Sequence, residues 1–270
     1  LSAFITIIKL FLFLFKKKKY DYFITDDILV IPGFLLKIKT FLFVDNDYKT
    51  LSLIKYLLPF ATKIICPSST ELSKFRKKLL KFRGNKALAY LSPKYFTPDR
   101  SKVLIESKYS LIRVSILDAV HDDENNKGIQ DEELTKLINL LEIHGKVYIS
   151  AEREISNKFE KYRLNIDPID MAHYINFSKI LITDSGTMAS EAAVLGVPNI
   201  LINNLAGSCG VHRELNNYNL QYFYDNFDDA YKMTENLLSK KNIKEIWKQR
   251  RKNFLTKTDD FTEFFYNLLK

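Results

Sequence analysis

The chain has few residues that can form cross-links or metal sites. Its 270 residues include only two cysteines, Cys66 and Cys209, and four histidines that lie far apart in the sequence. Two cysteines cannot form a disulfide framework, and none of these residues follows a metal-ligand spacing. The sequence therefore excludes a disulfide-stapled fold and predicts a reducing compartment. We expect no resident metal and no cofactor.

The sequence also lacks an apolar run long enough to cross a bilayer. Residues 1–15 carry a single charge, Lys9, and four lysines follow at 16–19. A spanning helix needs about 20 apolar residues, and a signal peptide carries its charge before the apolar run. We predict a helix packed on a sheet, with the lysines at the C-terminal end of its dipole. The alternative is contact with a membrane surface, so we expect a cytoplasmic protein, free or peripheral to the inner face of the membrane.

Acidic residues are scarce in the N-terminal part of the chain. Residues 1–98 hold 18 Lys and Arg against 6 Asp and Glu, a net charge of +12, whereas residues 99–270 carry a net −3. No nucleic-acid-binding module accompanies this charge, and we expect no nucleic-acid partner. The remaining interpretations are an anionic or lipid-linked substrate, an anionic membrane surface, or a solvated basic face.

Apolar runs alternate with helical patterns along the whole chain, and a proline-containing stretch at 90–100 interrupts them. This alternation predicts parallel sheets with helices on both faces, in two Rossmann-like domains, 1–98 and 99–270, that face each other across a cleft. The predicted strands are 20–25, 40–44, 63–67, 111–117, 146–150, 179–183 and 199–202. The predicted helices are 48–58, 69–82, 131–143, 168–177, 186–196, 227–239 and 242–268.

The stretch "TDSGTMASEAAVLG" (183–196) ends a predicted buried strand and begins a helix of small residues. Ligands of parallel sheets bind outside the carboxyl ends of the strands, where the first N–H groups of such a helix attract anions. Gly186 allows a ligand to approach the backbone closely, and Ser185 and Thr187 add hydroxyl groups. These features predict a diphosphate site.

Glu191 lies one helical turn after Thr187 on the same face of the predicted helix. A carboxylate in this position is suited to accept hydrogen bonds from the two hydroxyls of a ribose. The alternative for the whole stretch is purely structural: Ser185 caps the helix, Glu191 is solvated and the alanines pack against the sheet.

This stretch resembles the nucleotide-binding signature of GT-B sugar-nucleotide proteins. It is especially similar to that of the non-hydrolysing UDP-N-acetylglucosamine 2-epimerases, in which Ser-Gly precedes a ribose-binding Glu. The matching positions here are Ser185, Gly186 and Glu191. Thr187 departs from the epimerase pattern, which has a second glycine there.

The resemblance extends to the GT-B-like group known as domain of unknown function 354. The segments "AYLSPKYFTPD", "HDDENNKG", "GKVYISAE" and "EKYRL" are similar to members of this group, over about residues 20–240. Members begin with a further strand–helix–strand portion, so we expect the N-terminal domain of this chain to be incomplete. The resemblance implies an α/β, GT-B-like fold and a nucleotide-sugar ligand.

A second segment, "LDAVHDDENNKG" (117–128), is predicted to follow a strand at the cleft. His121, Glu124 and Asn125 match the His-Arg-Arg-Glu-Asn sequence of the epimerases, but Asp122 and Asp123 replace both arginines. The loss of two cations near a diphosphate argues against straightforward epimerase chemistry. The two acids could instead hold a divalent metal that contacts the phosphates, or the loop could be a solvated acidic turn.

Three other segments are predicted to lie near the same ligand. Glu152 and Arg153 end the strand 146–150, where Arg153 either offsets diphosphate charge or forms an ordinary surface ion pair. In GT-B proteins the base rests against the loop before the signature, so backbone groups near Ile169 are expected to bind it. The segment 203–215 either closes over the sugar or only connects two elements.

Together these features predict a GT-B-type glycosyltransferase that uses a UDP-sugar in polysaccharide or glycoconjugate synthesis. The donor would bind the C-terminal domain and a lipid-linked or anionic acceptor the basic N-terminal domain, with His121 or Asp26 as the catalytic base. The alternatives are an epimerase-like enzyme, which needs the acids that end the first strands, and a catalytically silent nucleotide-sugar-binding subunit.

Overall fold

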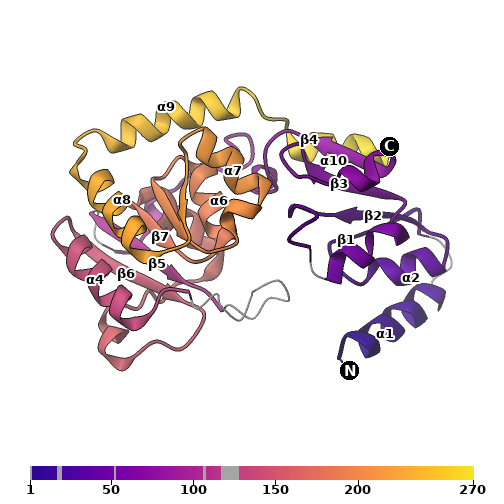
Figure 1. Cartoon of the computed structure of the whole chain (residues 1–270), viewed down its shortest axis with the longest axis horizontal. Helices are drawn as coiled ribbons and strands as arrows, with labels where there is room; N and C mark the ends of the chain where they lie inside the picture. Colours follow the sequence, from indigo (N-terminus) through magenta and orange to yellow (C-terminus); the bar gives the residue numbers. More distant parts are fainter. Residues whose placement is uncertain (1, 17–19, 52, 106–107, 117–127) are drawn as a thin grey trace. The chain divides into compact units, whose positions relative to one another are not determined.

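The computed structural model describes residues 2–16, 20–51, 53–105, 108–116 and 128–270. The chain forms two compact units (Figure 1). The first comprises residues 1–85 together with 208–211 and 259–270, and the second comprises 86–207 and 212–258. The sequence predicted a boundary at 98/99 and a continuous second domain. The compact units instead divide at 85/86, and the C-terminal residues return to the first unit.

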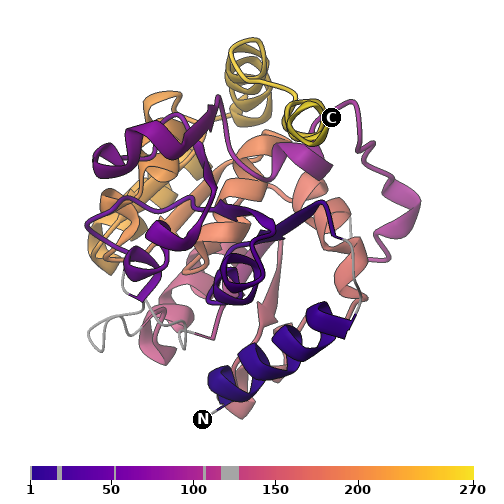
Figure 2. The ribbon, with the colours of Figure 1, turned by 90° about the vertical axis from the view of Figure 1, so that its right-hand side faces the viewer.

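The first unit is built on a parallel sheet of four strands in the order β1-β2-β3-β4. Helix α1 (Ser2–Lys16) packs beside the short helix α2 (Val30–Leu35), and Figure 2 shows α1 in indigo leading away from the N-terminus. The strands are β1 (Tyr22–Thr25), β2 (Lys39–Phe43), β3 (Lys63–Pro67) and β4 (Leu79–Phe82).

Both faces of this sheet are buried, because successive side chains of a strand point to opposite faces. Leu42 and Ile64 join a cluster that includes Val30 of α2. Their neighbours Phe41 and Ile65 join a second cluster, which is completed by the aromatic side chains of α10 (Phe261–Leu269). This aromatic packing explains why the end of the chain belongs to the first unit.

Strand β4 contradicts the helix that we predicted over residues 69–82. The segment forms a 3-10 helix at Ser73–Lys78 and then the strand, whose Leu79 and Leu80 pair with Ile64 and Ile65 of β3. Pairing with a buried strand outweighs the helical pattern of the lysine-rich sequence.

Two other helices were predicted longer than they are. Residues 48–58 contain a short 3-10 helix, Leu53–Tyr56, followed by a second one, Leu58–Phe60; Pro59 lacks the N–H group that a continuous helix would need. The C-terminal helix is divided into α9 (Ile243–Leu255) and α10, and Asp260 caps α10 by accepting a hydrogen bond from Glu263 N.

The second unit contains a parallel sheet of five strands in the order β6-β5-β7-β8-β9, with helices around it (Figure 1). Its strands are β5 (Tyr109–Val114), β6 (Lys146–Ala151), β7 (Leu181–Thr183), β8 (Asn199–Ile202) and β9 (Tyr222–Tyr224). Its helices, besides α9, are α3 (Leu88–Leu91), α4 (Asp131–Glu142), α5 (Met171–Phe177), α6 (Gly186–Leu195), α7 (Gly210–Asn217) and α8 (Phe227–Ser239).

The strand order places a topological switch point between β5 and β7. From β5 the chain continues to β6 on one side, and it later returns to β7 on the other side. In open parallel sheets, ligands bind outside the carboxyl ends of the strands at such a point. The segments after β5 and β7 are therefore the place to look for a site.

No helix in the described ranges has both the length and the apolar character needed to cross a membrane. Helix α1 buries Leu14 but exposes other apolar side chains, among them Phe13 and Phe15.

Candidate functional site

The junction of β7 and α6 forms as the sequence predicted. Ser185 is the N-cap of α6, and its hydroxyl accepts a hydrogen bond from Met188 N. The backbone N–H of Ser185 donates a hydrogen bond to the hydroxyl oxygen of Thr183, at 2.9 Å. Gly186 and Thr187 form the first turn, whose N–H groups have no partner within a helix. Ser185 thus acts as a cap, and the first turn still offers an anion its N–H groups and the helix dipole.

Helix α7 brings a histidine to this first turn. A Cβ atom on Gly186 would lie 2.8 Å from Nε2 of His212, so only glycine fits beside the imidazole. His212 is buried, and its Nδ1 lies 2.9 Å from Nε2 of the buried Gln221. From the sequence we expected the segment 203–215 either to cover the sugar or only to connect two elements. We did not predict that its second half forms part of helix α7.

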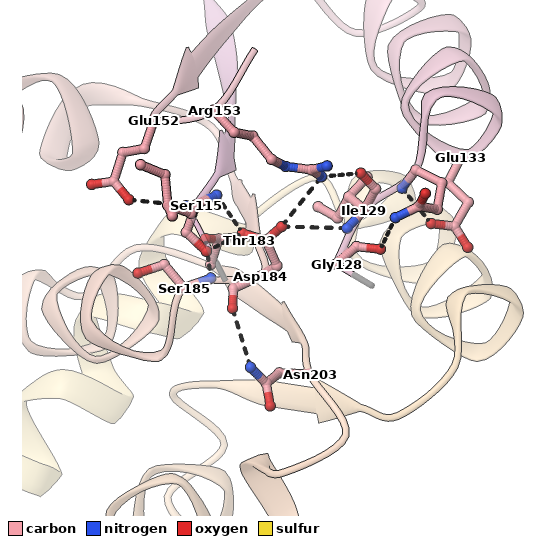
Figure 3. Close-up of polar contacts among 12 residues, drawn as sticks. Ser115, Gly128, Ile129, Glu133, Glu152, Arg153, Thr183, Asp184, Ser185 and Asn203 are labelled. Carbon is pink, nitrogen blue, oxygen red and sulfur yellow. Dashed lines mark hydrogen bonds and ion pairs between the residues drawn. The ribbon is translucent and has the colours of Figure 1, made fainter. Parts of the chain in front are cut away.

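Asp184, between β7 and the cap, holds two other segments in place (Figure 3). Its carboxylate is buried and accepts hydrogen bonds from both N and Oγ of Ser115, each at 2.8 Å, and from Ile129 N at 3.3 Å. Its backbone carbonyl accepts from Asn203 Nδ2 at 3.3 Å. Asp184 therefore ties the end of β5, the start of α4 and the segment after β8 to the head of α6.

Burial raises the pKa of Asp184, while the hydrogen bonds from Ser115 and Ile129 and the charge of Arg153 oppose this rise. Arg153 lies 3.9 Å from the carboxylate and donates to the carbonyl of Ile129 (Figure 3). The sequence offered two roles for Arg153, a phosphate contact or a surface ion pair. Arg153 instead pairs with the buried Asp184, so it reinforces the hydrogen bonds by which Asp184 holds the neighbouring segments.

A second arginine of this region was missed by the sequence reasoning. Arg113 in β5 donates to Ser150 Oγ of the neighbouring strand at 2.6 Å and forms an ion pair with Glu152. The other oxygen of Glu152 accepts from Ile116 N at 3.3 Å. Burial lowers the pKa of Arg113, and the nearby charges of Asp184 and Glu191 oppose this effect. Arg113 could have been identified from the sequence, because it is a charged residue within the otherwise apolar run of β5.

Glu191 lies half-buried in α6, about one turn from the N-terminal end of the helix. Its Oε1 accepts a hydrogen bond of 2.7 Å from the hydroxyl of Tyr90 in α3. Burial raises the pKa of Glu191, against the opposing effects of the Tyr90 hydrogen bond and of the charges on Arg113 and Lys86. The predicted ribose acceptor is thus neither fully solvated nor satisfied by a partner on its own helix.

The predicted base-binding loop forms a 3-10 helix, Pro168–Asp170, immediately before α5. The N–H of Ile169 donates to the carboxylate of Asp167 at 3.0 Å. This backbone donor is therefore already used within the protein. The side chain of Ile169 is 79% exposed and offers an apolar surface instead. His173, two residues into α5, is buried, and its Nδ1 accepts a hydrogen bond from Asp99 N.

Of the two predicted catalytic residues, Asp26 lies within the described part of the chain and His121 does not. Asp26 directly follows β1 in the first unit and is exposed. Its neighbour Asp27 is engaged locally, because it accepts hydrogen bonds from Leu29 N and from the Thr25 hydroxyl. His121 and Asn125 lie outside the residues that the structure describes, so their positions in the site remain predictions.

Residues 23–267 match the family described as "Protein of unknown function (DUF354)". The chain belongs to this family. The match confirms the membership that the sequence motifs predicted. A comparison with curated proteins gives no match.

Solved structures with the same fold include a UDP-GlcNAc 2-epimerase and a glycosyltransferase. MnaA of S. aureus, determined with UDP, superposes with a TM-score of 0.67 at 14% identity, over 97% of this chain and 78% of that chain. The UDP-GlcNAc 2-epimerase of Methanocaldococcus jannaschii, in complex with UDP-GlcNAc and UDP, gives 0.62 at 16% identity, over 94% and 80%. The spinosyn rhamnosyltransferase SpnG, with spinosyn aglycone, gives 0.60 at 10% identity, over 100% and 78%. The DUF354 chain thus has the α/β, GT-B-like fold, with its parallel sheets of four and five strands.

Proposed function

We propose that this DUF354 chain is a GT-B-type glycosyltransferase whose second unit binds a UDP-sugar. The observation that carries this proposal is the β7–α6 junction: a capped helix N-terminus, a glycine at its first position and Glu191 one turn later, at the switch point of a parallel sheet. The solved relatives determined with UDP share the fold and support this choice of ligand.

In this proposal each group has a separate task. The first-turn N–H groups and the dipole of α6 bind the diphosphate and stabilise it as it leaves the sugar. Glu191 accepts hydrogen bonds from the ribose hydroxyls, and the exposed side chain of Ile169 packs against the base. Arg113 adds a half-buried positive charge beside Glu191. Proton abstraction from the acceptor hydroxyl falls to His121 or Asp26.

Replacing Glu191 by glutamine is expected to weaken UDP binding about tenfold, because a neutral amide replaces the charged acceptor of the ribose hydroxyls. Inorganic diphosphate, which has no ribose, should bind the variant as it binds the wild type. Calorimetric titration with both ligands measures the difference. Equal losses for the two ligands would show that Glu191 supports the helix rather than the ribose.

A 2-epimerase-like reaction is the second candidate, because solved 2-epimerases share the fold. That reaction needs acids of the first unit for proton transfer. Asp47, however, is buried and accepts a hydrogen bond from Glu71 N, and Asp27 is occupied beside α2. Incubation with UDP-N-acetylglucosamine alone separates the candidates. An epimerase produces UDP-N-acetylmannosamine, whereas the proposed transferase leaves the sugar unchanged until an acceptor is added.

For the acceptor we propose an anionic or lipid-linked molecule at a membrane surface. The supporting features are the net charge of +12 on residues 1–98 and the exposed apolar side chains of α1. Each lysine near an anionic surface contributes about 1 kcal/mol, so changing the four lysines at 16–19 to glutamine should weaken vesicle binding by up to ~1,000-fold.

This prediction is tested by co-sedimentation with phosphatidylglycerol vesicles. Phosphatidylcholine vesicles and added salt are the controls, because both remove the electrostatic attraction. Equal binding to both kinds of vesicle, or no effect of the lysine changes, would contradict a basic membrane-contact surface.

A further inference from the structure

The contact between Tyr90 and Glu191 joins residues 101 positions apart in the sequence. Tyr90 lies in α3, at the start of the proline-containing stretch 90–100, and α3 packs against α6. The phenol hydroxyl donates to Oε1 at 2.7 Å, and Oε2 has no hydrogen-bond partner within the described part of the chain. One oxygen of this half-buried carboxylate is therefore held by the protein, while the other is left for a different donor.

Tyr90 does not serve as a core residue. It is 46% exposed, whereas Leu88 and Leu91 on either side of it are each only 2% exposed. These two leucines anchor the single turn of α3 in the second unit and fix the position from which the tyrosine extends. A side chain fixed by buried neighbours is suited to hold a partner in one rotamer, and it is poorly suited to swing out of a ligand's way.

The positive charges around Glu191 favour its ionised form. Arg113 from β5 and Lys86, just before α3, both act on the carboxylate, and Asp184 offsets part of the charge of Arg113. Burial raises the pKa of Glu191, and the Tyr90 hydrogen bond limits that rise. The phenol thus helps to keep the group ionised, in the form that accepts hydrogen bonds from hydroxyls.

We propose that Tyr90 is a positioning residue of the ribose site: its hydroxyl holds Oε1 of Glu191 so that Oε2 accepts the ribose hydroxyls of a bound nucleotide. This inference rests on the proposed function, because it requires that the α6 site binds a ribonucleotide. It adds a residue outside the signature stretch, from a separate segment of the second unit.

The test compares Tyr90→Phe, Glu191→Gln and the double variant in calorimetric titrations with UDP and with inorganic diphosphate. Tyr90→Phe should weaken UDP binding about fivefold to tenfold and leave diphosphate binding unchanged. Because Tyr90 acts through Glu191, adding Tyr90→Phe to Glu191→Gln should cause no further loss. The matched control is Tyr162→Phe, which removes another tyrosine–glutamate hydrogen bond, to Glu142 at 2.9 Å, and should leave UDP affinity unchanged.

The pH dependence of UDP affinity distinguishes a positioning role of Tyr90 from a role in stabilising the fold. UDP affinity should rise with pH as Glu191 loses its proton, and in Tyr90→Phe this rise should occur at higher pH, because the hydrogen bond that lowers the pKa is gone. Unchanged UDP affinity in Tyr90→Phe, with loss in Glu191→Gln, would overturn the inference and leave the proposed function standing. Tighter binding would also overturn it, since the phenol would then be a competitor for the ribose position. A wild type that binds neither UDP nor diphosphate would overturn both.

Discussion

Replacing Asp184 by alanine is expected to destabilise the second unit by about 3–5 kcal/mol. The change leaves the buried N–H groups of Ser115 and Ile129 without their acceptor and removes the partner of Arg153. The single tryptophan, Trp247, is fully buried in the second unit, so its fluorescence during urea unfolding reports this loss directly. Glu154→Ala, which removes an exposed carboxylate from the same edge of the sheet, is the control and should change stability little.

The contribution of Asp184 to the free energy of unfolding is expected to decrease as pH rises. The pKa of Asp184 is raised in the folded chain, so the native state holds this proton more tightly than the unfolded chain does. The resulting stabilisation is present at low pH and is lost as pH rises from about 4 through the native pKa. The stability advantage of the wild type over Asp184→Asn should therefore be largest near pH ~4 and shrink toward neutrality. An Asp184→Ala variant as stable as the wild type would contradict the role of Asp184 in holding these segments together, and an advantage that grows with pH would contradict the raised pKa.

The second large effect concerns Gly186. Gly186→Val should weaken UDP binding about 100-fold, or about 2.8 kcal/mol, because the side chain blocks the close approach of the diphosphate to the first turn of α6. Uridine, which lacks the diphosphate, should lose far less. Calorimetry with both ligands measures the difference, and the fluorescence of Trp247 shows whether the variant is folded.

His212 requires a further control for this prediction. A Cβ atom on Gly186 would lie 2.8 Å from its Nε2, so any substitution also displaces the imidazole. The variant pair Gly186→Ala and Gly186→Ala/His212→Ala separates the two effects, because the second variant has room for the new methyl group. If the double variant recovers wild-type UDP affinity, the glycine exists to accommodate His212. A loss that persists shows that the ligand itself needs the bare backbone.

Local signals explain what the sequence predicted well. Ser185 caps α6, and Gly196 ends it in the left-handed conformation (φ 76°), so both ends of the signature helix lie within one residue of the prediction. Helix α8 has the bounds that we predicted, 227–239, with Asn226 as its cap. The alternation of strands and helices was enough to predict two parallel sheets.

Long-range contacts explain most of what was missed. The bond of Tyr90 to Glu191 and those of Asp184 to Ser115 and Ile129 join residues with no local pattern between them. Strand β4 depends on pairing with β3, and β9 is short and only partly buried, so it lacks the buried apolar run that marked β7. The return of α10 to the first unit likewise depends on aromatic packing between distant residues.

The central claim, that the second unit binds a uridine diphosphate ligand at the head of α6, is tested most directly by calorimetric titration of the wild-type chain with UDP. We expect one site per chain, with inorganic diphosphate and uridine each binding more weakly than UDP, because each makes only part of the contacts. The absence of heat on addition of UDP at millimolar concentration, or UDP affinity no greater than that of diphosphate alone, would contradict it.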